Sequence, residues 1–160
     1  MPLRPQPPLH TPINPVSLNA EFLGRLHPLL LHFPITLLWV AGVVEVLRLK
    51  KDSAFLSRCA IALMAIGAIS ALLASGSGWL LAANEHIRKD ELETLFLHRW
   101  LGVATTVVAF AGWFVAARWR ESASRGQVWT RRLLIWISTG LLTAAAHYGA
   151  SIVWGSDWLG

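Results

Sequence analysis

Histidines are the residues of this chain whose type and spacing most clearly suggest chemistry. Two of the six lie in the segment LGRLHPLLLHFP (residues 23–34), each close to a proline, at the start of a long apolar run. Imidazole is a ligand of haem iron, copper and zinc, and an ionisable side chain inside a bilayer is costly unless it is paired or ligated. His27 and His32 are therefore candidate ligands. The alternative is that they anchor at the headgroups or hydrogen-bond a neighbouring helix.

Three further histidines belong to the same side of the membrane in the topology given below. His86 lies in the loop after the second apolar segment, His98 opens the third, and His147 lies about two turns before the end of the fourth. His10 is expected to be incidental. The loops on the other side contain no histidine, so this segregation is the strongest functional signal in the sequence.

Small and hydroxylated residues accompany two of these histidines at helical spacing, and such residues face neighbouring helices in membrane bundles. We therefore expect His98 and His147 to point into the bundle. We expect the same of His32, although the stripe beside it is less clear. The stripe with His98 comprises Gly102, Thr105, Ala109 and Gly112; that with His147 comprises Thr139, Gly140, Thr143, Ala144 and Ser151; that with His32 comprises Thr36, Trp39 and Val43. A stripe in the second segment comprises Gly67, Ala71, Ala74 and Gly78. It indicates either close helix packing or room for a flat cofactor.

The composition is that of a membrane protein. Of 160 residues, 54% are hydrophobic, only 14% are charged and nine are tryptophan. The net charge of +5 comes from basic residues in short loops between apolar runs, which is the positive-inside pattern and gives no support for nucleic-acid binding. The single cysteine, Cys59, excludes an internal disulfide and covalent attachment of a c-type haem. No nucleophile–base constellation suggests a hydrolase.

Four apolar segments, each near the roughly 20 residues needed to cross the hydrocarbon core, predict an all-α integral membrane protein. Their approximate ranges are 29–47, 59–83, 101–117 and 133–154. Because the connections are short, consecutive helices should be antiparallel neighbours in an up-down-up-down four-helix bundle. A short interfacial helix at about 18–26 precedes the first span. Residues 1–20, with six of the eight prolines, are expected to be an extended outer arm with no signal peptide, and residues 21–160 the transmembrane domain.

The distribution of basic residues predicts the orientation. Nine of the 14 lie between spans one and two or between spans three and four, and five lie on the other side, where six acidic residues dilute them. The positive-inside rule places the first set in the cytoplasm. Both termini and the histidines are then on the periplasmic side of a bacterial inner membrane. Glu45, near the cytoplasmic end of the first span, is expected to pair with Arg48 rather than to relay protons.

Four sequence motifs resemble those of an uncharacterised family of bacterial membrane proteins. The motifs are HPLLLHFP, GWLLA, HRWLG and HYGASIVWG. The family's domain of unknown function carries an HP-x3-HFP signature and is sometimes fused or adjacent to cytochrome c-type domains; the match covers about residues 22–157. The resemblance implies four helices and a role in electron transfer. Its functional positions would be His27, His32, His98 and His147. Ala150 departs from the pattern, where a second glycine is expected after Gly149.

Our first hypothesis is a membrane b-type cytochrome in which histidines near the outer side hold haem b. Haem iron takes two axial imidazoles, and a four-helix bundle supplies inward side chains from facing helices. Because the first and third spans are diagonal, we rank His32 with His98 as the ligands. His147 is the leading substitute, or the partner of His27 on a second haem. Such a protein would be an electron-transfer subunit of an oxidoreductase rather than an enzyme by itself.

The surroundings of the histidines suggest further contacts. Arg25 and Arg99, beside two of them in the sequence, would pair with haem propionates. The expected partners are the lipid bilayer, a periplasmic cytochrome c or other respiratory subunits, and further copies of the chain.

Two other hypotheses stay open. One is a copper or zinc site for transport or sensing, with ligands drawn from His27, His32, His98 and His147. No thiol cluster, Met-rich stretch or His-Glu-x-x-His motif accompanies these residues, and the first two lie roughly 140° apart on a helix, which is unfavourable for a simple helical pair. The other is a non-catalytic structural subunit of a larger membrane complex, in which the histidines are hydrogen-bonding residues.

Overall fold

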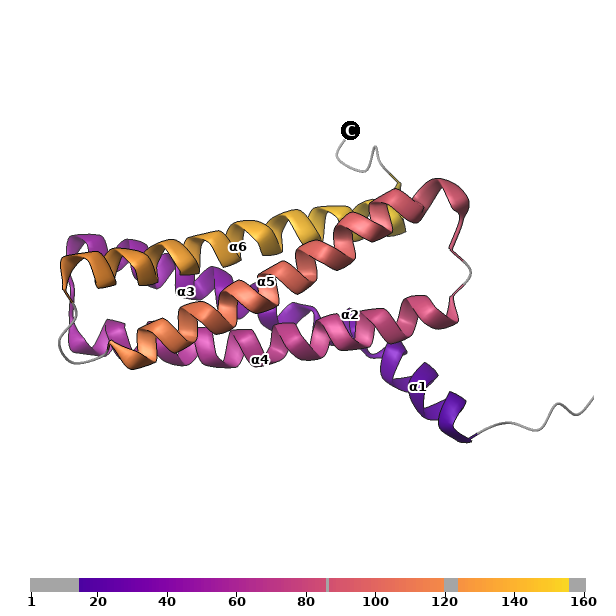
Figure 1. The fold of residues 1–160 in the computed structure, drawn as a ribbon, viewed down its shortest axis with the longest axis horizontal. Helices are drawn as coiled ribbons and strands as arrows, with labels where there is room; N and C mark the ends of the chain where they lie inside the picture. Colours follow the sequence, from indigo (N-terminus) through magenta and orange to yellow (C-terminus); the bar gives the residue numbers. More distant parts are fainter. Residues whose placement is uncertain (1–14, 86, 120–123, 156–160) are drawn as a thin grey trace, which may run out of the picture.

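The computed structural model describes residues 15–85, 87–119 and 124–155. These residues form six α-helices and one turn of 3₁₀ helix, with no strand in the described ranges (Figure 1). The α-helices are α1 (Pro15–Arg25), α2 (His27–Leu30), α3 (His32–Lys50), α4 (Ala54–Asn84), α5 (Leu92–Arg118) and α6 (Arg125–Trp154); the 3₁₀ turn η1 is Lys89–Glu91. The predicted all-α class is confirmed. Within the predicted N-terminal arm, residues 15–20 are helical, and residues 1–14 lie outside the described ranges.

The helices α3, α4, α5 and α6 form a four-helix bundle. Each packs against the next in the chain, and α6 closes the bundle against α3, so α3 and α5 lie on one diagonal. Short connections make consecutive helices antiparallel (Figure 1). Four helical stretches are long and apolar enough to cross a membrane. The predicted up-down-up-down bundle is confirmed. Its four columns are α1–α3 taken together, α4, α5 and α6, and each column begins before the span predicted for it.

Two prolines divide the first column into α1, α2 and α3. Proline has no N–H, so Pro28 and Pro34 cannot donate to the carbonyl one turn earlier, and the helix is interrupted once before each of them. The bend turns α1 away from the bundle axis (Figure 1) while α1 still packs on α4. Gly24 allows this approach, because a Cβ on it would lie 2.7 Å from the backbone nitrogen of Leu81. The short helix expected before the first span is therefore α1, and its bend fixes where His27 lies.

Small and medium-sized apolar side chains fill the centre of the bundle. The core comprises Leu38, Ala41, Met64, Ala68, Ala109, Ile135 and Leu142. Large apolar side chains cover the outside, among them Val46, Ile66, Val107, Phe114 and Ile137. In membrane bundles, small residues pack between helices while large apolar residues face lipid, so this distribution is that of helices surrounded by a bilayer.

The two ends of the bundle differ in chemistry. At one end, α4 ends, α5 begins and α6 ends, and α1 and α2 pack against α4; we call it the histidine end, because His27 and His98 lie there. The opposite end, where α3 ends and α4 and α6 begin, contains three buried arginines; we call it the arginine end.

Candidate functional site

Two histidines approach each other inside the histidine end. His27 begins α2 and His98 lies on α5, so they come from two diagonal columns of the bundle. Their ring centroids are 6.1 Å apart, with the ring planes at 80°. Both are half-buried, and His98 faces inward as predicted, with Thr105 and Ala109 of its stripe buried. Histidines from diagonal columns therefore do meet, as the sequence predicted. The partner of His98 is His27, whereas the sequence ranked His32 first.

Both rings are held by a backbone carbonyl through Nδ1. His27 Nδ1 lies 2.9 Å from the carbonyl oxygen of Ala74, with Ser77 Oγ at 3.3 Å. His98 Nδ1 lies 2.8 Å from the carbonyl oxygen of Ala145. A carbonyl only accepts hydrogen bonds, so each Nδ1 carries the proton and donates it. In its neutral form a ring held in this way presents an unprotonated Nε2, which is the atom that ligates a metal, and metal-binding histidines are usually oriented in this way.

A glycine lies against each ring. A Cβ on Gly78 would be 2.9 Å from His27 Cε1. A Cβ on Gly149 would likewise be 2.9 Å from His98 Cε1. A larger residue at either position would push the imidazole away from the carbonyl that holds it. The small residues that accompany the histidines therefore make room for the rings themselves.

The same arrangement occurs once in each half of the chain. In each half, a histidine contacts the carbonyl of an alanine 47 residues later, and the glycine one turn beyond that alanine lies against the ring. The first half uses α2 and α4, the second α5 and α6. The sequence analysis named Ala74 only as part of a small-residue stripe, and it did not single out Ala145. The equal spacing of His, Ala and Gly in the two halves is the sequence pattern that could have revealed these contacts.

The predicted inward orientation of His32 is wrong. Its side chain is exposed, as are those of Thr36, Trp39 and Val43 in its stripe. Five residues turn a helix by about 500°, which leaves His27 and His32 roughly 140° apart. Because His27 points into the bundle, His32 lies on the outward, apolar side.

The predicted inward orientation of His147 is also wrong. Its side chain is exposed, as are Gly140 and Thr143 of its stripe, and its ring packs edge-on against Tyr148 with centroids 5.6 Å apart. The buried face of α6 comprises Arg131, Arg132, Ile135, Ser138, Thr139, Leu142 and Ala145. Small residues occur on both faces of α6, so a stripe defined by them did not identify the packed face.

Arg99, which follows His98 in the chain, has a buried donor with an unmet hydrogen bond. Its guanidinium carbon lies 4.6 Å from the ring centroid of Trp79, and its Nε is buried without a hydrogen-bond partner among the described residues. Leaving a buried donor unpaired is unfavourable, so this N–H is available to a carboxylate. Arg25, in contrast, is exposed and pairs with Glu21 on α1. The two predicted propionate partners therefore differ in their surroundings, and their role stays a prediction.

The small-residue stripe on α4 serves close packing. A Cβ on Gly67 would lie 2.7 Å from Leu38 Cδ2, and Gly78 accommodates the ring of His27. The sequence left open whether this stripe provides close packing or room for a flat cofactor. At both glycines, a side chain from a neighbouring helix packs into the stripe.

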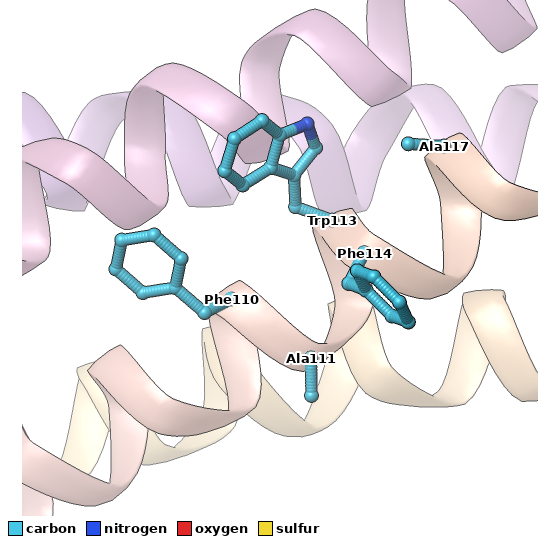
Figure 2. A pocket seen from close by; sticks show the side chains of 5 residues that line it. All are labelled: Phe110, Ala111, Trp113, Phe114 and Ala117. Atoms are coloured by element: carbon cyan, nitrogen blue, oxygen red, sulfur yellow. The ribbon is translucent and has the colours of Figure 1, made fainter.

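A shallow hollow on α5 lies away from the histidines. It has a volume of about 450 Å³ and is lined by Phe110, Ala111, Trp113, Phe114 and Ala117 (Figure 2). By the helical rise, Phe110 lies about 18 Å along the helix from His98. The lining is almost entirely apolar and offers few groups to orient a ligand, so we do not include it in the candidate site.

Within the described ranges, no three His, Cys, Asp or Glu side chains gather closely enough to hold a metal ion. His10 and His86 lie outside those ranges. The described part of the chain therefore offers the paired imidazoles as its candidate ligands, and a group that takes two nitrogens suits them best.

The family described as "Predicted membrane protein (DUF2231)" matches residues 25–157. This range contains both histidines of the pair and both alanines whose carbonyls hold them. No curated protein and no solved structure matches the chain.

Proposed function

We propose that this chain, which belongs to the DUF2231 family of predicted membrane proteins, is an electron-transfer protein that holds haem b between His27 and His98. The observation that carries the proposal is the pair of half-buried imidazoles whose Nδ1 atoms both donate to backbone carbonyls. Two imidazoles that are held through Nδ1 and come from diagonal columns of the bundle are a suitable ligand set for a bis-histidine b-type haem.

The separation of the rings suits one ion between them. With a metal–nitrogen bond of about 2 Å and a ring nitrogen about 1.2 Å from the ring centre, two axial imidazoles have centroids roughly 6–6.5 Å apart. The centroids of His27 and His98 are 6.1 Å apart. The distance between the two ring centres therefore matches that of two imidazoles that bind one ion.

The chain's own residues would hold the group and tune it. The carbonyls of Ala74 and Ala145 would keep Nδ1 protonated and make Nε2 a stronger donor to the iron. Arg99, with its unpaired buried Nε, would bind a propionate. Bound haem would supply reversible one-electron transfer.

This assignment keeps the diagonal pairing expected from the sequence and replaces one ligand. His32 and His147 are exposed, so neither lies on the inward side that His98 occupies. We therefore propose one haem held by His27 and His98, with no ligand role for His32 or His147.

A copper ion bound by the same two histidines is the second candidate. A protein zinc site almost always takes four ligands, or three with a water, and the described residues gather no third His, Cys, Asp or Glu into such a group. Two imidazoles in line suffice for cuprous copper, and imidazole is one of its suitable ligands. In that case the protein would carry or sense copper.

We propose that this site lies at the periplasmic face of a bacterial inner membrane. The five basic residues on the histidine side, against nine on the other, support that assignment through the positive-inside rule. A haem near this face of an inner membrane would exchange electrons with a periplasmic cytochrome c or with another respiratory subunit beside it in the bilayer.

An absorption spectrum of the protein purified from haem-sufficient cells tests the proposal. We expect a Soret band, sharp low-spin bands on reduction, and haem that acid acetone extracts, because nothing links it covalently. A colourless protein with stoichiometric copper would refute the haem and support the copper site. A colourless protein free of metal would refute both and leave the histidines as hydrogen-bonding residues of a structural subunit.

A further inference from the structure

Charged side chains are buried at the arginine end, where α3, α4 and α6 meet. Glu45 is fully buried, and Arg48, Arg131 and Arg132 expose 4%, 5% and 7% of their surfaces. Glu45 pairs with Arg48, as the sequence predicted: Arg48 Nη1 donates to Glu45 Oε1 at 2.6 Å. Arg132 Nε donates to Glu45 Oε2 at 3.2 Å. Both oxygens of the buried carboxylate are therefore engaged by these two arginines.

Cations outnumber anions in this cluster. The other carboxylate that the described residues bring to it is Asp52, which accepts a hydrogen bond from Arg48 Nε at 2.8 Å and is half-exposed. Three guanidinium groups thus face two carboxylates, of which Glu45 alone is buried. A buried charge without a counter-charge is strongly unfavourable, so the cluster has a place for a further anion.

Arg131 is the arginine left with unmet hydrogen bonds. Its Nη1 reaches Ser57 Oγ at 3.4 Å, and its Nε lies 3.4 Å from Glu45 Oε1. Its Nε and Nη2 are buried and have no hydrogen-bond partner in the described part of the chain. Buried polar groups are nearly always hydrogen-bonded. Because Nε already faces the Glu45 carboxylate, Nη2 is the donor that points to a ligand that completes the cluster.

We propose that Arg131 binds the phosphate group of an anionic molecule at the arginine end. A guanidinium presents its N–H donors as a fork that matches the oxygens of a phosphate. The long helix α4 begins three residues before Ser57, so the positive end of its dipole adds to the attraction. Asp52, the surface carboxylate of the cluster, would yield its place beside Arg48 to the incoming group.

The position of the cluster favours a phospholipid headgroup as the source of the phosphate. The arginine end lies where candidate membrane spans begin or end. Three exposed basic residues lie there as well: Lys50 at the end of α3, Lys51 after it, and Arg58 near the start of α4. Basic pockets between transmembrane helices bind anionic lipid headgroups on the cytoplasmic side. A free phosphate ion offers the same chemistry and is the other source.

Native mass spectrometry of the detergent-purified protein tests this site with two probes. These are phosphatidylglycerol, with zwitterionic phosphatidylcholine as reference, and inorganic phosphate. We expect phosphatidylglycerol to bind about ten-fold more tightly than phosphatidylcholine, and Arg131→Gln to remove that preference. Arg58→Gln removes an exposed arginine at the same end and should leave it intact. Asp52→Asn should tighten phosphatidylglycerol binding several-fold, because it removes a competing carboxylate.

The remaining outcomes either assign the site to a different anion or refute it. Tight binding of inorganic phosphate, with the same dependence on Arg131 and Asp52, would support the site and assign it to a free anion. Binding of both probes unchanged by Arg131→Gln would overturn it. If circular dichroism shows that Arg131→Gln does not fold, Asp52→Asn decides: no gain in binding of either probe overturns the proposal.

Discussion

Each paired histidine depends on a glycine for its place against the neighbouring helix. A Cβ on Gly149 would lie 2.9 Å from His98 Cε1, so Gly149→Ala should push Nδ1 off the carbonyl of Ala145. Losing such a contact typically costs about 10- to 100-fold in metal affinity, and we expect a loss of that size in a haem titration in detergent. Gly140→Ala, on the same helix with no atom within 4 Å of its Cβ position, should keep the affinity. Equal effects of the two substitutions would contradict this reading.

The sequence named His27 and His98 among its four candidate histidines, but it did not predict that these two histidines face each other. The rotation between His27 and His32 showed that both could not point inward. Choosing between them required knowing how Pro28 and Pro34 bend the first column, which is set by packing of α1 and α2 on α4. For His147 the small residues around it lie on both faces of α6, so composition did not determine its direction.

At the level of helices, Glu45 ties α3 to α6 through its contact with Arg132. Glu45→Gln would leave three buried arginines without their buried counter-charge, and we expect it to lower the free energy of unfolding by about 3–5 kcal/mol. Glu85→Gln, which changes an exposed glutamate at the end of α4, should change it by less than about 0.5 kcal/mol. Unfolding followed by circular dichroism in mixed micelles would measure both. A stability of Glu45→Gln equal to that of Glu85→Gln would show that the network does not join the helices.

The number, order and type of the long helices could be read from the sequence, whereas their first turns could not. A run of apolar residues marks the part of a helix that lies in hydrocarbon, but hydrogen bonding continues into polar residues. At the start of α6, the Ser124 side chain accepts from the Gln127 N–H and the Gln127 side chain accepts from the Ser124 N–H. This capping box begins the helix at Arg125, eight residues before the apolar run.

For the molecule as a whole, the orientation rests on the distribution of basic residues. In a Cys59→Ala background, Lys89→Cys should react with a membrane-impermeant thiol reagent added to intact cells, and Lys51→Cys should react only after lysis. Both positions are exposed and lie at opposite ends of the bundle, so their accessibility differs only by side of the membrane. The reverse labelling pattern would place the paired histidines at the cytoplasmic face.

The ligand pair is tested most directly by the reduced absorption spectra of four single variants. We expect His27→Ala and His98→Ala each to abolish the low-spin haem spectrum, because each removes one of the two imidazoles that meet at 6.1 Å. His32→Ala and His147→Ala remove exposed imidazoles and should leave it unchanged. An intact low-spin spectrum in the His27→Ala, His98→Ala double variant, or its loss in a folded His32→Ala protein, would contradict the assignment.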